Sequence, residues 1–171
     1  MLKKVAALSI TDPLTGLFNR RRFEEVLDSE FKKSSRYMFP LSCMMMDIDH
    51  FKTVNDTYGH PVGDTVIKDI ALIINQCVRD VDTLSRWGGE EFVVLAPMTP
   101  KSDALLPARR ILTTVAEHTF AGMGEKHVTI SIGIADLTSP GIDTPDKLIQ
   151  AADKVLYEAK KNGRNRIETA G

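Results

Sequence analysis

The sequence has few cysteines and no long hydrophobic run, and each absence excludes a class of protein. Only Cys43 and Cys77 occur among 171 residues, too few for the disulfide framework of a small secreted domain and typical of a reducing compartment. Cys43 lies in an apolar run, where a buried free thiol is expected. No stretch approaches the roughly 20 apolar residues of a membrane span, and no signal peptide is recognisable. We therefore expect a cytoplasmic protein, or the cytoplasmic domain of a membrane-anchored one, without membrane contact of its own.

The chain also lacks an excess of charge of either sign. It carries 22 basic and 23 acidic residues, with a formal net charge of -1 at pH 7, and the two signs are interspersed. This balance argues against a polymeric nucleic acid as the partner, although it is compatible with local binding of phosphate. A chain of this length is expected to form one domain with a sizeable core.

Hydrophobic periodicity predicts alternating helices and strands, without repeats or low-complexity segments. The apolar run Leu41–Ile48 predicts a buried strand, and two β-rich segments around Gly88-Gly89 predict a hairpin. Pro107 predicts a kink or a later start in its helix. Helices are expected over residues 19–34, 49–58, 64–78, 101–120 and 144–162, and further strands over 128–135 and 166–168. Residues 2–9 read as the end of a helix, so we divide the chain into a linker, 1–10, and a domain, 11–171. The pattern predicts an α/β fold, an α+β sandwich with a mainly antiparallel sheet.

The most informative segment is Arg86-Trp87-Gly88-Gly89-Glu90-Glu91-Phe92. Paired glycines predict a tight turn with positive φ at both, and their bare backbone lets a ligand approach. Adjacent carboxylates are costly unless a cation neutralises them, and Asp47 ends a neighbouring strand. Alternation along a strand would point Glu90 and Glu91 to opposite sides. The acids are compatible with a Mg²⁺ site completed by substrate phosphates and equally with solvated turn acids.

Three other groups of polar residues have both a functional and an ordinary interpretation. Asn55 and Asp64 suit the edge of guanine, but also a surface amide and a helix N-cap. A basic pair at a helix end suits a triphosphate or a solvated terminus near the helix dipole; this pair is Lys160 and Arg164. An arginine with a nearby acid suits a purine nucleotide or a surface salt bridge; these are Arg79 and Asp82.

Taken in order, these segments resemble the GGDEF family of bacterial diguanylate cyclases over nearly the whole chain. The resemblance is carried by Thr11-Asp12-Pro13-Leu14-Thr15-Gly16-Leu17, Asp47-Ile48-Asp49-His50-Phe51-Lys52, Gly59-His60-Pro61-Val62-Gly63-Asp64, Gly88-Gly89-Glu90-Glu91-Phe92, Ser131-Ile132-Gly133 and Gly163-Arg164-Asn165. It implies a palm-like fold related to nucleotidyl cyclases and polymerases. It also implies that two GTP become cyclic di-GMP and two pyrophosphates, with one GTP held by each of two facing protomers of a homodimer.

The resemblance also implies roles for individual residues. The expected metal is Mg²⁺, with Mn²⁺ as an alternative, and its ligands would be Asp47, the Ile48 carbonyl, Glu90 and Glu91. Glu90 also matches the catalytic base, and the division of these roles stays open. Lys52 would stabilise phosphate charge. Substrate contacts would come from Phe51, Asn55, His60, Asp64, Gly88, Gly89, Lys160 and Arg164. Cyclic di-GMP would inhibit at a site formed by Arg79 and Asp82, which Arg110 joins from a neighbouring protomer in some members.

The chain departs from the family pattern at two positions. Glu90 stands where Asp is commoner and keeps the charge, whereas Pro107 affects the geometry around Arg110. Two alternatives stay open. A non-catalytic module that binds GTP or cyclic di-GMP would be expected to have degenerate signature positions, and none is seen. A different nucleotidyl cyclase or a polymerase-like enzyme would be expected to use ATP as readily as GTP.

Overall fold

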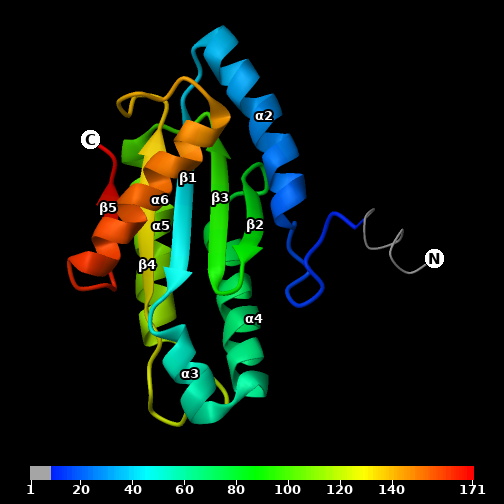
Figure 1. The fold of residues 1–171 in the computed structure, drawn as a ribbon, viewed down its shortest axis with the longest axis vertical. Helices are drawn as coiled ribbons and strands as arrows, with labels where there is room; N and C mark the ends of the chain where they lie inside the picture. Colours follow the sequence, from blue (N-terminus) through cyan, green and yellow to red (C-terminus); the bar gives the residue numbers. More distant parts are fainter. Residues whose placement is uncertain (1–8) are drawn as a thin grey trace.

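The fold is built on a five-stranded sheet in the order β2-β3-β1-β4-β5 (Figure 1). In this computed structural model, which describes residues 9–171, every strand pairing is antiparallel except β4 with β5. The strands are β1 Leu41–Ile48, β2 Thr83–Gly88, β3 Glu91–Pro97, β4 Ile130–Asp136 and β5 Ile167–Thr169. The helices are α2 Arg20–Tyr37, α3 Phe51–Tyr58, α4 His60–Cys77, α5 Lys101–Glu117 and α6 Pro145–Lys161. The predicted mainly antiparallel α/β fold is confirmed, whereas residues 1–8 of the expected linker helix lie outside the described residues.

Strand β1 lies at the centre of the molecule, with all eight residues buried. Met44 and Met46 pack in one core with α4 and α5, whereas Cys43 and Met45 pack in a second core with α2 and α6. Helices therefore cover both faces of the sheet (Figure 1), which explains why β1 reads as a continuous apolar run. Cys43 is a free buried thiol as predicted, and burial raises its pKa to about 12.

Helix α4 begins four residues earlier than predicted, at His60 rather than Asp64. Gly59, with a φ of +87°, ends α3 and separates the two helices. Pro61 occupies the first turn of α4, where its fixed φ suits a helix and its missing N–H costs no hydrogen bond. Asp64 therefore lies inside the helix, and its interpretation as an N-cap is wrong.

Helix α5 starts at Lys101 and continues through Pro107 to Glu117, so the predicted later start is also wrong. A proline within a helix removes the hydrogen bond to the carbonyl four residues earlier, which here belongs to Asp103. The loss falls on the side of α5 where Asp103 and Leu106 are exposed, while Ala104 and Ala108 pack into the core.

The signature hairpin turns at Gly89 and Glu90 rather than at the two glycines. Gly88 pairs with Glu91, and a register shift between Arg86 and Gly88 forms a bulge in β2. Of the two glycines, only Gly89 has a positive φ, +41°, so the expectation of positive φ at both is wrong. Glu90 lies in the turn, and strand alternation does not set its direction.

Gly133 fixes the distance between β4 and α6. A Cβ built on it would lie 2.2 Å from the Ala152 carbonyl oxygen and 2.3 Å from the Leu156 backbone nitrogen. Only glycine allows backbones to approach so closely. The approach seats α6 on the sheet, and Lys160 in the last turn of α6 then reaches the end of β1.

We predict that Gly133→Ala destabilises the protein by about 1–3 kcal/mol or more, because backbone atoms must move to admit the methyl group. Urea unfolding monitored by circular dichroism measures the change. Gly88→Ala is the matched control, since it adds the same methyl group to a strand glycine with open space around it and no positive φ. Equal stability losses in the two variants would contradict this account of α6 packing.

Candidate functional site

The register of the central strands brings the four predicted metal residues together. Asp47, at the end of β1, pairs with Glu91 at the start of β3. The Ile48 backbone N–H donates to the Glu90 carbonyl at 3.2 Å, which ties the hairpin turn to β1. Residues far apart in the chain thus form one edge of oxygen groups.

Lys160 extends from α6 to this edge and forms an ion pair with Asp47. Its Nζ lies 2.8 Å from Asp47 Oδ2, and Asp47 is 8% exposed. Burial raises the pKa of Asp47, Lys160 opposes that rise, and Glu90 and Asp49 add to it. Burial also raises the pKa of Glu91, with the charge of Asp47 as the next cause. The site therefore holds more negative charge than Lys160 alone compensates.

The donor set fits a hard divalent cation. It offers carboxylate and carbonyl oxygens, which Mg²⁺ prefers, and Lys160 is the cation paired with Asp47 there. Within residues 9–171 no three acidic, histidine or cysteine side chains converge into a preformed metal cage. Mg²⁺ is commonly bound by one or two carboxylates together with substrate phosphates.

The predicted guanine-reading residues lie on two adjoining helices. Asn55 lies on α3, and a Cβ built on Gly63 of α4 would lie 1.9 Å from the Asn55 Oδ1 atom. Glycine at this position therefore lets the amide of Asn55 lie directly against α4. His60 and Asp64 are exposed at the start of α4, and Phe51 is buried at the start of α3. The structure thus places Asn55, His60 and Asp64 around one helix junction.

The remaining predicted substrate residues are exposed. Gly88 and Gly89 have open space where a Cβ would stand, so the surface of the hairpin is accessible. Lys52 pairs with Asp56 on α3 at 2.9 Å, with 90% of its side chain exposed. Arg164 lies beyond α6 with a φ of +63°.

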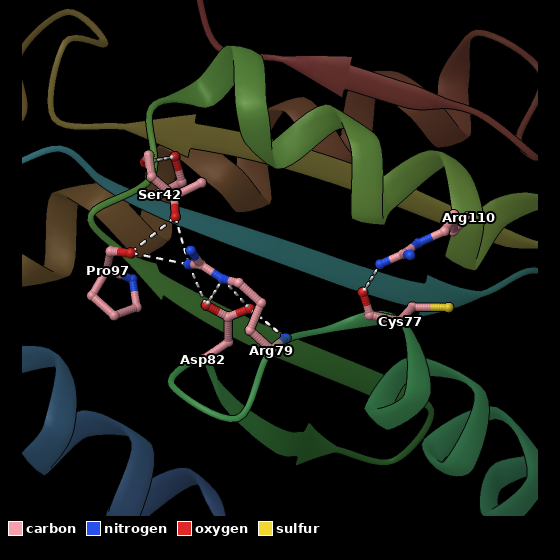
Figure 2. Close-up of polar contacts among 7 residues, drawn as sticks. Ser42, Cys77, Arg79, Asp82, Pro97 and Arg110 are labelled. Carbon is pink, nitrogen blue, oxygen red and sulfur yellow. Dashed lines mark hydrogen bonds and ion pairs between the residues drawn. The ribbon is translucent and has the colours of Figure 1, made fainter.

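The three predicted inhibitory residues line one cavity of about 210 Å³. Arg79 Nη2 lies 2.7 Å from Asp82 Oδ1, and the Arg79 backbone N–H donates to Asp82 Oδ2 at 2.8 Å. Figure 2 shows the side chains of Arg79 and Asp82 facing each other. Arg110, on α5, donates from Nη2 to the Cys77 carbonyl at 2.7 Å. Arg110 thus lines the cavity from the same chain as Arg79 and Asp82, and Pro107 lines it too.

Sequence reasoning missed the two residues that hold the hairpin turn. Arg86 donates to the Gly89 carbonyl at 2.9 and 2.7 Å, and its Nη1 lies 3.1 Å from Asp12 Oδ2. Asp12 also accepts from the Thr15 backbone N–H and hydroxyl. The turn that precedes α2 is thereby linked to the turn that carries Glu90. Both residues stand inside conspicuous motifs, but no local pattern pairs them.

The sequence of this chain matches a known protein family and characterised relatives. The family profile "Diguanylate cyclase, GGDEF domain" matches residues 9–166. The response regulator PleD of Caulobacter vibrioides is 44% identical over 163 residues, which cover 94% of this chain and 36% of PleD. This chain thus spans well under half the length of that relative.

Solved structures show the same fold. The GGDEF domain of DgcB from Caulobacter crescentus, determined in complex with c-di-GMP, superposes with a TM-score of 0.87 at 32% identity, over 94% of this chain and 92% of that one. The active GGEEF domain of a diguanylate cyclase from Vibrio cholerae superposes with a TM-score of 0.84 at 33% identity, over 90% and 97%. In the described part of our chain, no helix has the length and hydropathy to cross a membrane.

We predict that Glu91→Gln stabilises the metal-free protein at pH 7. Because the pKa of Glu91 is raised in the folded state, the folded protein holds this proton to a higher pH than the unfolded chain, whose Glu pKa is about 4.3. The free energy of unfolding therefore falls as the pH rises from the pKa of Glu91 in the unfolded chain through its higher pKa in the folded protein. Glutamine avoids the loss, so the gain should vanish below about pH 4, where both states are protonated.

Urea unfolding in the presence of a chelator, at both pH values, measures the effect. Glu125→Gln is the control, since it removes the same charge from an exposed position. An equal gain from Glu91→Gln at acidic and neutral pH would contradict the electrostatic explanation.

Proposed function

The chain belongs to the GGDEF family of diguanylate cyclases, and on this premise we propose that it condenses two GTP into cyclic di-GMP and two pyrophosphates. The observation that supports this most directly is the strand register that places Asp47 beside Glu91, with the turn at Glu90 tied to Ile48. A nucleotidyl transfer centre needs acidic residues, and Asp47, Glu90 and Glu91 all carry a carboxylate.

The proposed reaction transfers a nucleotidyl group without a covalent enzyme intermediate. The 3′-hydroxyl of one GTP attacks the α-phosphorus of the other, a new phosphodiester bond forms, and the bond to the β-phosphate breaks to release pyrophosphate. Catalysis then depends on positioning and on neutralising charge. Glu90, in the turn, is the candidate to accept the hydroxyl proton and also a candidate metal ligand. Bound Mg²⁺ would supply neutralisation of the phosphate oxygens.

The basic residues are proposed to hold the triphosphate. Lys160 uses one of its three ammonium donors on Asp47, which leaves two for phosphate oxygens. Arg164 and Lys52 are exposed, so their side chains can reorient towards a phosphate without breaking buried contacts. Asn55 and Asp64, with His60 nearby, would read the guanine edge.

We propose that two copies of the chain act together. Cyclic di-GMP contains two guanosine units, whereas one chain carries a single pair of guanine-reading residues, Asn55 and Asp64. A second copy brings the second GTP, so that each 3′-hydroxyl faces the α-phosphate of the other molecule. Activity should then depend on association of the protomers.

We further propose that cyclic di-GMP inhibits the enzyme at the cavity of Arg79, Asp82 and Arg110. Two arginines and a carboxylate around about 210 Å³ provide donors for phosphate and an acceptor for a base N–H. Arg79 is already oriented by Asp82 and by the Thr99 hydroxyl at 2.7 Å, so little ordering is needed on binding. Inhibition requires that bound product favours an arrangement of protomers that keeps the two GTP apart.

We predict that the protein at high concentration converts GTP with Mg²⁺ into cyclic di-GMP, detected by mass spectrometry. Glu90→Gln should reduce the rate by about 100-fold or more, because it removes a candidate base. ATP should be a poor substrate, since adenine lacks the N–H groups that Asp64 accepts.

Three results would speak against this function. No product at high protein concentration would contradict it, and nucleotide binding without turnover would favour a non-catalytic binding module. Equal turnover of ATP would contradict guanine recognition and favour a different nucleotidyl cyclase.

We predict that Arg79→Ala raises the concentration of added cyclic di-GMP needed for half-inhibition by about tenfold or more, because a charged hydrogen-bond donor is lost. Inhibition is measured for each variant relative to its own uninhibited rate. Arg109→Ala is the matched control, as an exposed arginine of α5 that does not line the cavity. The same inhibition curve for Arg79→Ala and the wild type would exclude this site.

A further inference from the structure

Asp49 is a buried carboxylate that has no assigned role in the proposed reaction. It lies two residues after Asp47 and is 5% exposed. Its Oδ1 accepts from the Ser131 hydroxyl at 2.7 Å, and its Oδ2 accepts from the Thr129 hydroxyl at 2.7 Å and from the Asn165 backbone N–H at 3.0 Å. Within residues 9–171 no cation forms an ion pair with it. Three neutral donors thus compensate a buried negative charge that would otherwise be costly.

The contact with Asn165 holds a turn that is costly to form. Gly163, Arg164 and Asn165 have φ values of +120°, +63° and +45°, so two consecutive residues with side chains adopt the left-handed region. This conformation is unfavourable for a residue with a side chain and persists only where its surroundings hold it. Backbone hydrogen bonds hold the two ends of the turn, from the Arg164 N–H to the Ala159 carbonyl and from the Ile132 N–H to the Arg166 carbonyl. Asp49 holds its middle.

This turn carries Arg164, which the proposed function assigns to the triphosphate. Asp49 joins it across 116 residues of sequence to the end of β1, where Asp47 lies. Asp49 therefore links the candidate metal edge to the turn that carries the candidate triphosphate arginine.

We propose that Asp49 is a positioning residue for nucleotide binding, which fixes the turn at residues 163–166 so that Arg164 meets the triphosphate. The proposal rests on the proposed function for the identity of the ligand. It assigns Asp49 to the triphosphate half of the site and not to guanine recognition. The charge of Asp49 strengthens this contact, because a carboxylate oxygen accepts the Asn165 N–H more strongly than the neutral amide oxygen of an asparagine would.

Asp49→Asn is the direct test, with equilibrium binding of two probes. The first is α,β-methylene-GTP, whose α–β bridge cannot be broken by the reaction, and the second is GMP, which lacks the β- and γ-phosphates. We expect the variant to bind the triphosphate analogue about tenfold more weakly and GMP as the wild type does. Equal losses for both probes would indicate a merely structural effect and would overturn the proposal.

A double-mutant cycle tests whether Asp49 acts through Arg164. Arg164→Ala alone should weaken binding of the triphosphate analogue, and adding Asp49→Asn should weaken it little further, because the two changes remove the same interaction. Fully additive losses would contradict the proposal. Thr129→Val is the matched control: it removes another donor to Asp49 without touching Asn165, so the ratio of the two affinities should stay that of the wild type.

Amide hydrogen exchange of the wild-type protein tests the contact without any variant. The Asn165 residue is exposed, yet its N–H should exchange slowly, because the buried carboxylate accepts it. Fast exchange would overturn the proposal even if Asp49→Asn proved too unstable to study. A wild type that binds neither nucleotide would contradict the proposed function, while the exchange of Asn165 would still decide the contact.

Discussion

The pairing of Asp47 with Glu91 is the constraint on which the rest of the site depends. Strand β1 is bonded on both sides, to β3 and β4, so its end cannot shift without breaking two ladders. Because side chains alternate with a period of two, a slip by one residue would turn Asp47 to the opposite face, away from Lys160. The buried methionines of β1 and their two separate cores therefore determine where the acids of the hairpin lie.

The candidate metal edge carries acidic groups at a cost in stability. Asp47 and Glu91 share a partly desolvated edge, and burial raises the pKa of both. Lys160 compensates part of the charge, and Gly133 allows α6 to approach closely enough for that contact. Around this edge, Arg86 ties the hairpin turn to Asp12, and Asp49 ties the C-terminal turn to β1. The chain thus holds partly buried acidic groups between fixed elements, which is the arrangement that the proposed binding of metal and triphosphate would use.

The elements with regular periodicity could be predicted from the sequence, and contacts between distant segments could not. The prediction of β1 is confirmed to the residue because a doubly covered strand leaves a continuous apolar run. Helix α4 starts four residues before its predicted start because Pro61 suits the first turn of a helix. The hairpin turn lies one residue beyond its predicted position because a bulge shifts the register of β2. Arg86 meets Asp12 across 74 residues and Asn165 meets Asp49 across 116. Such pairs depend on tertiary structure, which no local pattern encodes.

We propose that each chain carries half of a catalytic centre, and dilution of the protein tests this most directly. Specific activity with GTP and Mg²⁺ should be measured over a series of protein concentrations, with the oligomeric state followed by sedimentation in the same buffer. The account predicts that activity per chain falls in parallel with the fraction of associated protomers. Cyclic di-GMP formation at constant activity per chain, at concentrations where sedimentation shows only monomers, would contradict it.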